Sequence, residues 1–380
     1  MAPKQLLLPA VVLALAATAC GAEHGTNDQP AAARPRGVYA VGATVFGLGA
    51  RTVKLAAPPV APLAGWLTPA AVPSPDERYL AYNAWEELRE DDPALSWSDQ
   101  GIEPGDPLAT PSIRLYDAST GTDELLEDGA FSVAWRADGA LAYFKGAERD
   151  YRAGVPYVGS VFVRSAPGAK AVKWSSEEGR YIVVSWADGS LVGYREHEGE
   201  ALDVVAFEGP GRMRVIAPDS GLVALSPDGR RAFVEQGPAQ GRPNVRVLDV
   251  ASAKVVARLD LTGVDPSVGA VDYAGDWQGD RVVASTASGL AVFRVRPKTI
   301  ALEQAIRVKG AGLSEPHFAT ASPGHVTAWA SVESGGVLFD CDRATGRCAS
   351  FKPLPQAHGV HGFPVWRRNL YNPSRPLREG

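Results

Sequence analysis

Short apolar runs separated by turn residues recur along most of the chain. The clearest copy is residues 223–234, where an apolar run meets Ser226-Pro227-Asp228-Gly229 and a second apolar run follows two arginines. Pro presets the backbone angle of a turn, Asp bonds back to the backbone and Gly closes the turn. Each flanking run has the length of one strand, and residues 181–186 are apolar on both faces. The pattern therefore predicts strand pairs joined by tight turns.

Less perfect copies of this unit recur at regular intervals. The residue before each turn lies at positions 73, 135, 174, 225, 277, 321 and 366. Most of these intervals are near the roughly 40–50 residues of a four-stranded repeat. A second hairpin follows further along the unit, for example at residues 245–259. Four strands per unit, repeated around an axis, predict an all-β chain folded as a β-propeller.

The two ends of the repeat region complete each other. Trp366, the last anchor, has almost no chain after it, and the apolar runs within 38–55 have no anchor before them. We expect 362–368 to supply the inner strand and 37–55 the outer strands of one shared blade, because sharing closes the ring and removes sheet edges. The prediction is a seven-bladed β-propeller of four-stranded antiparallel blades over residues 37–380, with six blades as the alternative.

The Ser-Pro-Asp-Gly-Arg turns resemble the WD40-like propeller repeats of bacterial envelope proteins, the type found in TolB. The resemblance covers about residues 37–380, although the Trp-Asp dipeptide of eukaryotic WD40 repeats is absent. It implies a propeller fold. It does not carry over a function, because TolB-type proteins have a separate domain before the propeller and residues 20–36 are too few to form one.

The first 19 residues are typical of an export signal. Lys4 precedes an apolar run, residues 6–19, that is shorter than the roughly 20 residues of a bilayer span. Ala17-Thr18-Ala19-Cys20 resembles the lipobox of bacterial lipoproteins, which implies cleavage before Cys20 and its lipidation. The alternative is an ordinary secretory signal cut after Ala19 or later.

Residues 20–36 lack an apolar period and are expected to form a flexible tether. No other stretch is apolar enough to span a bilayer, so we expect an extracytoplasmic body held to the membrane by the lipid on Cys20. Cys341 and Cys348 flank a turn between two strand-like runs. A hairpin can bring two such cysteines to disulfide distance in an exported protein, and two free thiols are the alternative.

The composition changes the functional picture in one respect. The chain is 45% hydrophobic and 21% charged, as a folded globular protein should be, and its net charge is −5. This acidity argues against a nucleic-acid binder, which needs a basic face. We expect a monomer without a cofactor.

Two long links between strands are candidate binding loops, because function concentrates in loops on a rigid scaffold. Residues 86–110 hold eight acids and one base, and residues 145–157 form a second long link. Both join second and third strands, so we expect them side by side on one face. The candidate binding residues are Glu86, Glu87, Glu90, Asp91, Asp92, Trp97, Tyr151 and Tyr157. They would suit a basic or sugar-like partner; a merely solvated acidic loop is the alternative.

Two other residue groups are not assigned to a site. Three histidines could approach one another on the same face: His317, His358 and His361. No nearby Cys or carboxylate completes a ligand set of recognisable spacing, so no metal site is predicted. Four tryptophans precede predicted turns: Trp135, Trp174, Trp277 and Trp366. We expect them on inner strands, packing between blades.

The chain contains no nucleophile elbow, phosphate loop or HExxH zinc motif. One function class that remains is a non-enzymatic scaffold that binds a protein or an envelope polysaccharide. The other is a secreted glycoside hydrolase or lyase with its site at the propeller channel mouth. An enzyme should show converging carboxylates and at least one perturbed titrating group. The missing motifs favour the scaffold.

Overall fold

The computed structural model divides into two units, residues 1–34 and 35–380, and every described residue belongs to the second. The described residues are 39–41, 43–48, 51–59, 71–87, 109–146, 158–187, 189–197, 202–236, 243–262, 264, 268, 271–286, 289–307, 316–322, 325–332 and 335–351. Strands and turns make up nearly all of them. No helix in these ranges has the length and apolar character that crossing a membrane requires.

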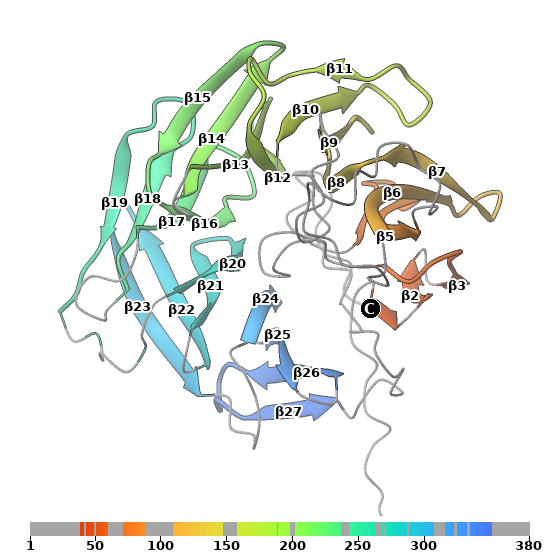
Figure 1. Ribbon diagram of the computed structural model, residues 1–380. Coiled ribbons are helices and arrows are strands. Elements are labelled where there is room, and N and C mark those ends of the chain that lie inside the picture. The colour runs from red at the N-terminus through yellow and green to blue at the C-terminus, as the bar shows by residue number, and fades with distance from the viewer. Residues whose placement is uncertain are drawn as a thin grey trace, which may run out of the picture. The chain divides into compact units, whose positions relative to one another are not determined.

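The strands form groups whose members follow one another in chain order, here called blades (Figure 1). Blade 1 contains β1 (Tyr39–Val41), β2 (Thr44–Leu48) and β3 (Arg51–Lys54). Blade 2 contains β4 (Ala71–Pro73), β5 (Tyr79–Glu87), β6 (Ala109–Asp117) and β7 (Thr122–Asp128). Blade 3 contains β8 (Ala130–Trp135), β9 (Leu141–Gly146), β10 (Gly159–Arg164) and β11 (Val172–Lys173). Blade 4 contains β12 (Arg180–Ala187), β13 (Ser190–Glu196), β14 (Leu202–Gly209) and β15 (Arg212–Ala217).

Three further blades complete the described strands. Blade 5 contains β16 (Gly221–Leu225), β17 (Arg231–Glu235), β18 (Val245–Asp249) and β19 (Val255–Leu259). Blade 6 contains β20 (Val271–Gln278), β21 (Arg281–Thr286), β22 (Gly289–Arg296) and β23 (Lys298–Arg307). Blade 7 contains β24 (Pro316–Ser322), β25 (His325–Val332), β26 (Gly335–Asp342) and β27 (Cys348–Phe351).

This succession of antiparallel blades is the predicted β-propeller, and it is consistent with seven blades. First strands of successive blades contact each other: β8 contacts β12, β16 contacts β20, and β20 contacts β24. Apolar side chains fill the space between neighbouring blades, as between blades 4 and 5 and between blades 5 and 6. The predicted N-terminal strands form blade 1. Residues 362–368, the expected inner strand of that blade, lie outside the described residues.

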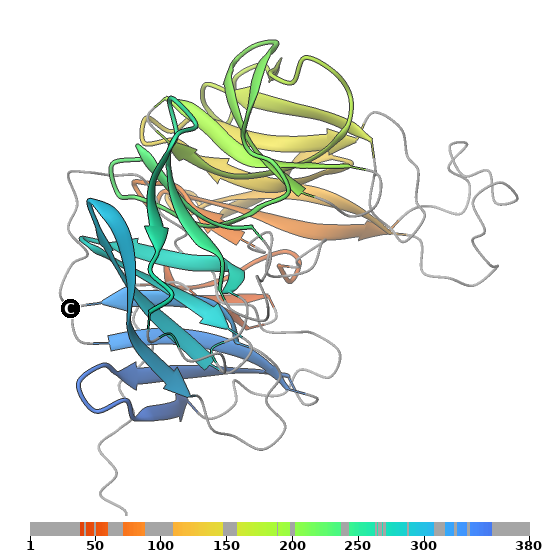
Figure 2. The same ribbon diagram turned by 90° about the vertical axis from the view of Figure 1, so that its left-hand side faces the viewer.

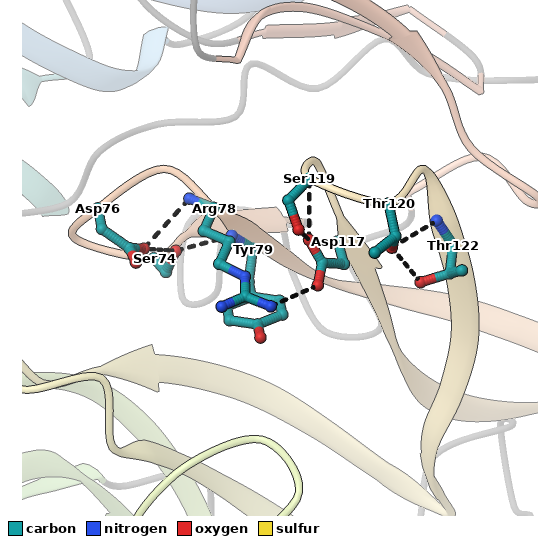
Figure 3. Close-up of polar contacts among 8 residues, drawn as sticks. All are labelled: Ser74, Asp76, Arg78, Tyr79, Asp117, Ser119, Thr120 and Thr122. Carbon is teal, nitrogen blue, oxygen red and sulfur yellow. Dashed lines mark hydrogen bonds and ion pairs between the residues drawn. The ribbon is translucent and has the colours of Figure 1, made fainter.

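Hydrogen bonds explain why the Ser-Pro-Asp turn recurs (Figure 3). Ser74 Oγ donates to Asp76 Oδ1 at 2.6 Å and accepts from the Tyr79 N–H at 2.8 Å. The same Asp76 oxygen accepts from the Arg78 N–H at 3.1 Å. Arg78 Nη2 then donates to Asp117 Oδ2 at 3.1 Å, which ties this turn to the β6–β7 turn beside it. The residue types of the repeat therefore hold adjacent hairpins together.

The same contacts recur in blade 5, where Ser226 Oγ donates to Asp228 Oδ1 at 2.5 Å and accepts from the Arg231 N–H at 2.9 Å. The last turn position needs a positive φ, which Gly229 adopts at 68°. In blade 2 that position is Glu77, with φ of 59°. The turn keeps its geometry there although a side chain must occupy the left-handed region.

The structure corrects one copy of the repeat. We expected Trp174 to end an inner strand, but it follows β11, the outer strand of blade 3. The inner strand of blade 4 is β12, and Trp186 near its end takes the anchor position. The sequence was misread because residues 172–173 and 181–184 flank a turn-like segment that links two blades rather than two strands of one blade. Trp135 and Trp277 do lie on the inner strands β8 and β20, whereas Trp366 lies outside the described residues.

Blades 5 and 6 are also joined at their outer strands. β19 pairs with β23 in parallel, with Ala257 opposite Lys298, Arg258 opposite Thr299 and Leu259 opposite Ile300. The strand order across both blades is therefore continuous, from β16 to β19, then β23 back to β20. Figure 2 shows these long strands from a second direction.

The predicted disulfide forms in blade 7. Cys341 on β26 lies directly opposite Cys348 on β27, with the two Cα atoms 4.0 Å apart, and their sulfurs are bonded. The bond crosses the last described hairpin, so it stabilises that hairpin against opening.

Candidate functional site

The two predicted loops leave neighbouring blades at the same end. Strands β5 and β6 pair up to Glu87 and Ala109, and β9 and β10 pair up to Gly146 and Gly159, so both links join a second to a third strand. The blades are aligned alike, because equivalent tryptophans make equivalent contacts. Trp135 Nε1 donates to the Val72 carbonyl at 2.9 Å, and Trp186 Nε1 donates to the Ala134 carbonyl at 3.2 Å. We call this side of the blades the loop end.

The structure places only part of the candidate binding set. Glu86 and Glu87 end β5, opposite Thr110 and Ala109. The other candidates lie outside the described residues: Glu90, Asp91, Asp92, Trp97, Tyr151 and Tyr157. His317 belongs to β24, and His358 and His361 are not described. Within the described part of the chain, no three His, Cys, Asp or Glu side chains are grouped as a metal site would need.

A charged network stands at the root of the second loop. Glu127 accepts hydrogen bonds from Tyr143 Oη at 2.8 Å and Arg164 Nη2 at 2.7 Å, and it pairs with Lys145 one residue before Gly146. Burial opposes ionisation of Glu127, but the hydrogen bonds from Lys145, Arg164 and Tyr143 outweigh it and lower the pKa of this carboxyl. Burial also raises the pKa of Tyr143 to about 12. The network holds β7 of blade 2 against β9 and β10 and fixes the base of the loop.

Blade 4 brings an aspartate and a histidine together at the loop end. Asp203, only 5% exposed, accepts from Arg195 Nη2 at 2.9 Å, and its Oδ2 lies 2.6 Å from His197 Nε2. The Asp219 N–H donates to its other oxygen at 3.1 Å. Burial is again outweighed by these hydrogen bonds, so the pKa of Asp203 is lowered. Among the described residues no hydroxyl or thiol is bonded to His197.

Glu235 in the next blade has the opposite environment. It ends β17, is 1% exposed, and accepts the Asn244 N–H at 3.1 Å on Oε1 and 3.2 Å on Oε2. Burial raises its pKa from 4.5 to about 7, against the smaller opposing effect of the Asn244 N–H. No basic side chain of the described residues pairs with it. Glu235 is therefore a titrating group with a perturbed pKa, which is one of the two features expected of an enzyme; the other is a pair of converging carboxylates.

Sequence reasoning missed Asp203, His197 and Glu235. The available signal was their position in the repeat: each lies within one residue of the end of a second strand or the start of a third strand. The candidate loops join strands at the same positions. Forty-three acids in the chain make such a position too common to select a residue without knowing its burial. The loop end therefore combines two carboxylates held in ion pairs, Glu127 and Asp203, with one carboxyl whose pKa is raised, Glu235. The ion pairs fix the strands from which the loops start, as a binding surface requires.

No family model matches the chain, and no curated protein matches it. Solved propeller structures are similar to it. The β-propeller domain of the Trilobed protease from Pyrococcus furiosus has a TM-score of 0.47 and 13% identity, over 83% of this chain and 90% of that domain. TolB from Acinetobacter baumannii has a TM-score of 0.38 and 11% identity, over 70% of this chain and 65% of TolB.

An acylaminoacyl peptidase from Pyrococcus horikoshii has a TM-score of 0.48 and 10% identity, over 82% of this chain. The match spans 47% of the peptidase, so this chain covers about half the length of that enzyme. At such identities the similarity concerns the propeller fold.

Proposed function

We propose that this protein is an extracytoplasmic, lipid-anchored β-propeller that binds a protein or a cell-envelope polysaccharide without transforming it. The lipid is attached at Cys20, residues 20–36 are the tether, and the propeller works as a monomer without a cofactor. The Cys341–Cys348 bond supports an oxidising compartment.

One observation carries the binding role. Two long second-to-third-strand links leave adjacent blades at the loop end, and the first of them is strongly acidic. Rigid blades with charged residues at the loop roots present such links to a partner at low entropic cost. A basic protein surface or a sugar chain with many hydroxyl groups would complement them.

Replacing residues 88–108 by Asn-Gly should abolish capture of the partner from envelope extract. Strands β5 and β6 stay paired to Glu87 and Ala109, and Asn-Gly closes a two-residue hairpin, so the blade can fold without the insert. Captured proteins and polysaccharides would be identified by mass spectrometry and sugar analysis, and compared with those of the unaltered propeller.

Two further variants separate charge from length. One keeps the loop but changes Glu90, Asp91, Asp92, Asp99, Glu103 and Asp106 to their amides. The other replaces residues 147–158, the whole segment between the paired Gly146 and Gly159, by the same Asn-Gly turn. Capture of the same partner by all forms would contradict the proposal.

Cys20→Ser should release the protein from the membrane. Without the thiol no lipid can be attached, and a chain with no lipid should appear in the extracytoplasmic aqueous fraction after cell fractionation. A palmitate label should be lost in parallel. Continued membrane retention of Cys20→Ser with no loss of label would show that the anchor is elsewhere.

A carbohydrate-active enzyme is the second candidate, and Glu235 is the observation that favours it. A carboxyl with a pKa near 7 can act as a general acid in glycoside cleavage. Such an enzyme would release reducing sugar from an envelope polysaccharide, and Glu235→Gln would stop that release.

A further inference from the structure

A row of arginines crosses the outer face of blades 5 and 6. Arg246 on β18 lies directly opposite Arg258 on β19. Arg258 lies opposite Thr299 on β23, and Thr299 lies opposite Arg296 on β22. The strands β18, β19, β23 and β22 lie next to one another in that order (Figure 1). Residues paired in this way point to the same face of a sheet, so the three arginines form a line across these four strands. With neighbouring strands about 4.8 Å apart, the row is roughly 14 Å long.

The chain supplies no counter-charge to this row within its described part. None of the three arginine side chains forms a hydrogen bond or ion pair there, and Arg246 Nε is buried without an acceptor. Burial and the nearby Arg258 charge lower the pKa of Arg246. The nearest acid along β19 is Asp260, whose carboxylate accepts the Thr262 N–H at 2.9 Å instead. Like charges placed directly opposite each other on adjacent strands are destabilising.

Blade 6 shows how the same chain neutralises such a pair. Arg281 on β21 lies directly opposite Arg294 on β22. Glu303 on the adjacent strand β23 accepts Arg281 Nε at 2.7 Å and lies 3.3 Å from Arg294 Nη2. Asp280 adds contacts of 3.3 Å to both arginines. In the row, the adjacent position on β23 is the neutral Thr299.

We infer that the row of Arg246, Arg258 and Arg296 binds a linear polyanion carrying phosphate or carboxylate groups. Glu303 neutralises the arginine pair inside blade 6, and an anionic group of the ligand would neutralise the arginines of the row in the same way. Guanidinium groups bind these oxyanions in two-point contacts. Three cations in line match a chain with repeated charges better than one small anion, and none of the row positions is aromatic, so the row offers charge without stacking bases. This site is separate from the loop end.

The test measures binding of sodium polyphosphate to the whole propeller by calorimetry, with inorganic phosphate as the single-charge probe. Polyphosphate should bind at least tenfold more tightly than phosphate, and added salt should weaken it. Arg246→Gln, Arg258→Gln and Arg296→Gln should each weaken it severalfold. Arg347→Gln, which removes the same charge from an exposed turn of blade 7, should leave it unchanged.

Thr299→Glu is the decisive variant, because it places an acid between Arg258 and Arg296 as Glu303 is placed beside its own pair. It should lower the affinity for polyphosphate at least tenfold and raise the thermal midpoint, whereas the neutral Thr299→Gln should do neither. Circular dichroism confirms that each variant is folded. Equal polyphosphate binding by both variants would overturn the inference.

Two other results would also overturn it. Binding to phosphatidylglycerol vesicles but not to polyphosphate would assign the row to lipid headgroups. A dimer that Thr299→Glu dissociates, seen by sedimentation, would assign it to a second copy of the chain.

Discussion

Replacing Trp186 by Ala is expected to reduce the free energy of unfolding by about 3–5 kcal/mol, the range for removing a large aromatic side chain from a core. Trp186 is 3% exposed, and its Nε1 donates to the Ala134 carbonyl of the preceding blade at 3.2 Å. The Arg136 guanidinium lies 4.8 Å from its ring centre. The variant loses the packing of Trp186 against residues of both blade 3 and blade 4. Urea denaturation followed by circular dichroism would measure the decrease in the free energy of unfolding.

Trp174→Ala is the matched control. Trp174 is only partly buried and touches Trp186 edge-on, with ring centres 5.3 Å apart. Removal of the Trp174 side chain should reduce the free energy of unfolding by less than half as much, because Trp174 follows the outer strand β11 and does not belong to an inner strand. An equal cost for Trp174→Ala and Trp186→Ala would contradict this ranking of the two tryptophans.

The comparison of these two tryptophans shows what a turn pattern can and cannot determine. The Ser-Pro-Asp-Gly sequence indicates a tight turn after a strand. The hydrogen bonds that stabilise this turn join residues within five positions of one another, so turns and strands were predictable along most of the chain. Whether a turn joins two strands of one blade or links two blades depends on pairing between distant residues. Tyr181–Trp186 is apolar on both faces, as the inner strand between two blades must be, and that signal was present in the sequence.

The sequence predicts which strands the links at the loop end connect, but it does not predict the pKa values of the carboxyl groups there. Alternating strands place every second-to-third link on one side, so the sequence was enough to predict that the links after Glu87 and Gly146 leave their blades at the same end. The sequence could not show that Asp203 ionises readily while Glu235 resists ionisation. That difference depends on which donors reach each carboxyl after folding: Arg195 and His197 for one, a single backbone N–H for the other.

Glu235→Gln is expected to stabilise the protein at pH 8 by up to about 3 kcal/mol, because a pKa unit corresponds to about 1.4 kcal/mol. The folded-state pKa of Glu235 is about 7, above its ordinary value of 4.5. Below pH 4.5 the carboxyl is protonated in both states and the native state carries no penalty. As pH rises from 4.5 to 7 the unfolded chain releases the proton first, so stability falls, and the loss is complete above about pH 7.

Urea denaturation of the two forms at pH 5, 6, 7 and 8 would measure this dependence. The amide can accept the Asn244 N–H but leaves its own NH2 group without a partner, which offsets part of the gain. The difference between the two curves is therefore the sharper readout, and it should grow with pH and level off near pH 7.

Asp203→Asn should behave oppositely, because a lowered pKa stabilises the native state at high pH and the contribution is lost as pH falls through it. A pH-independent difference for Glu235→Gln would mean that Glu235 ionises freely in the folded protein, which would also remove the observation that favours a general acid at the loop end.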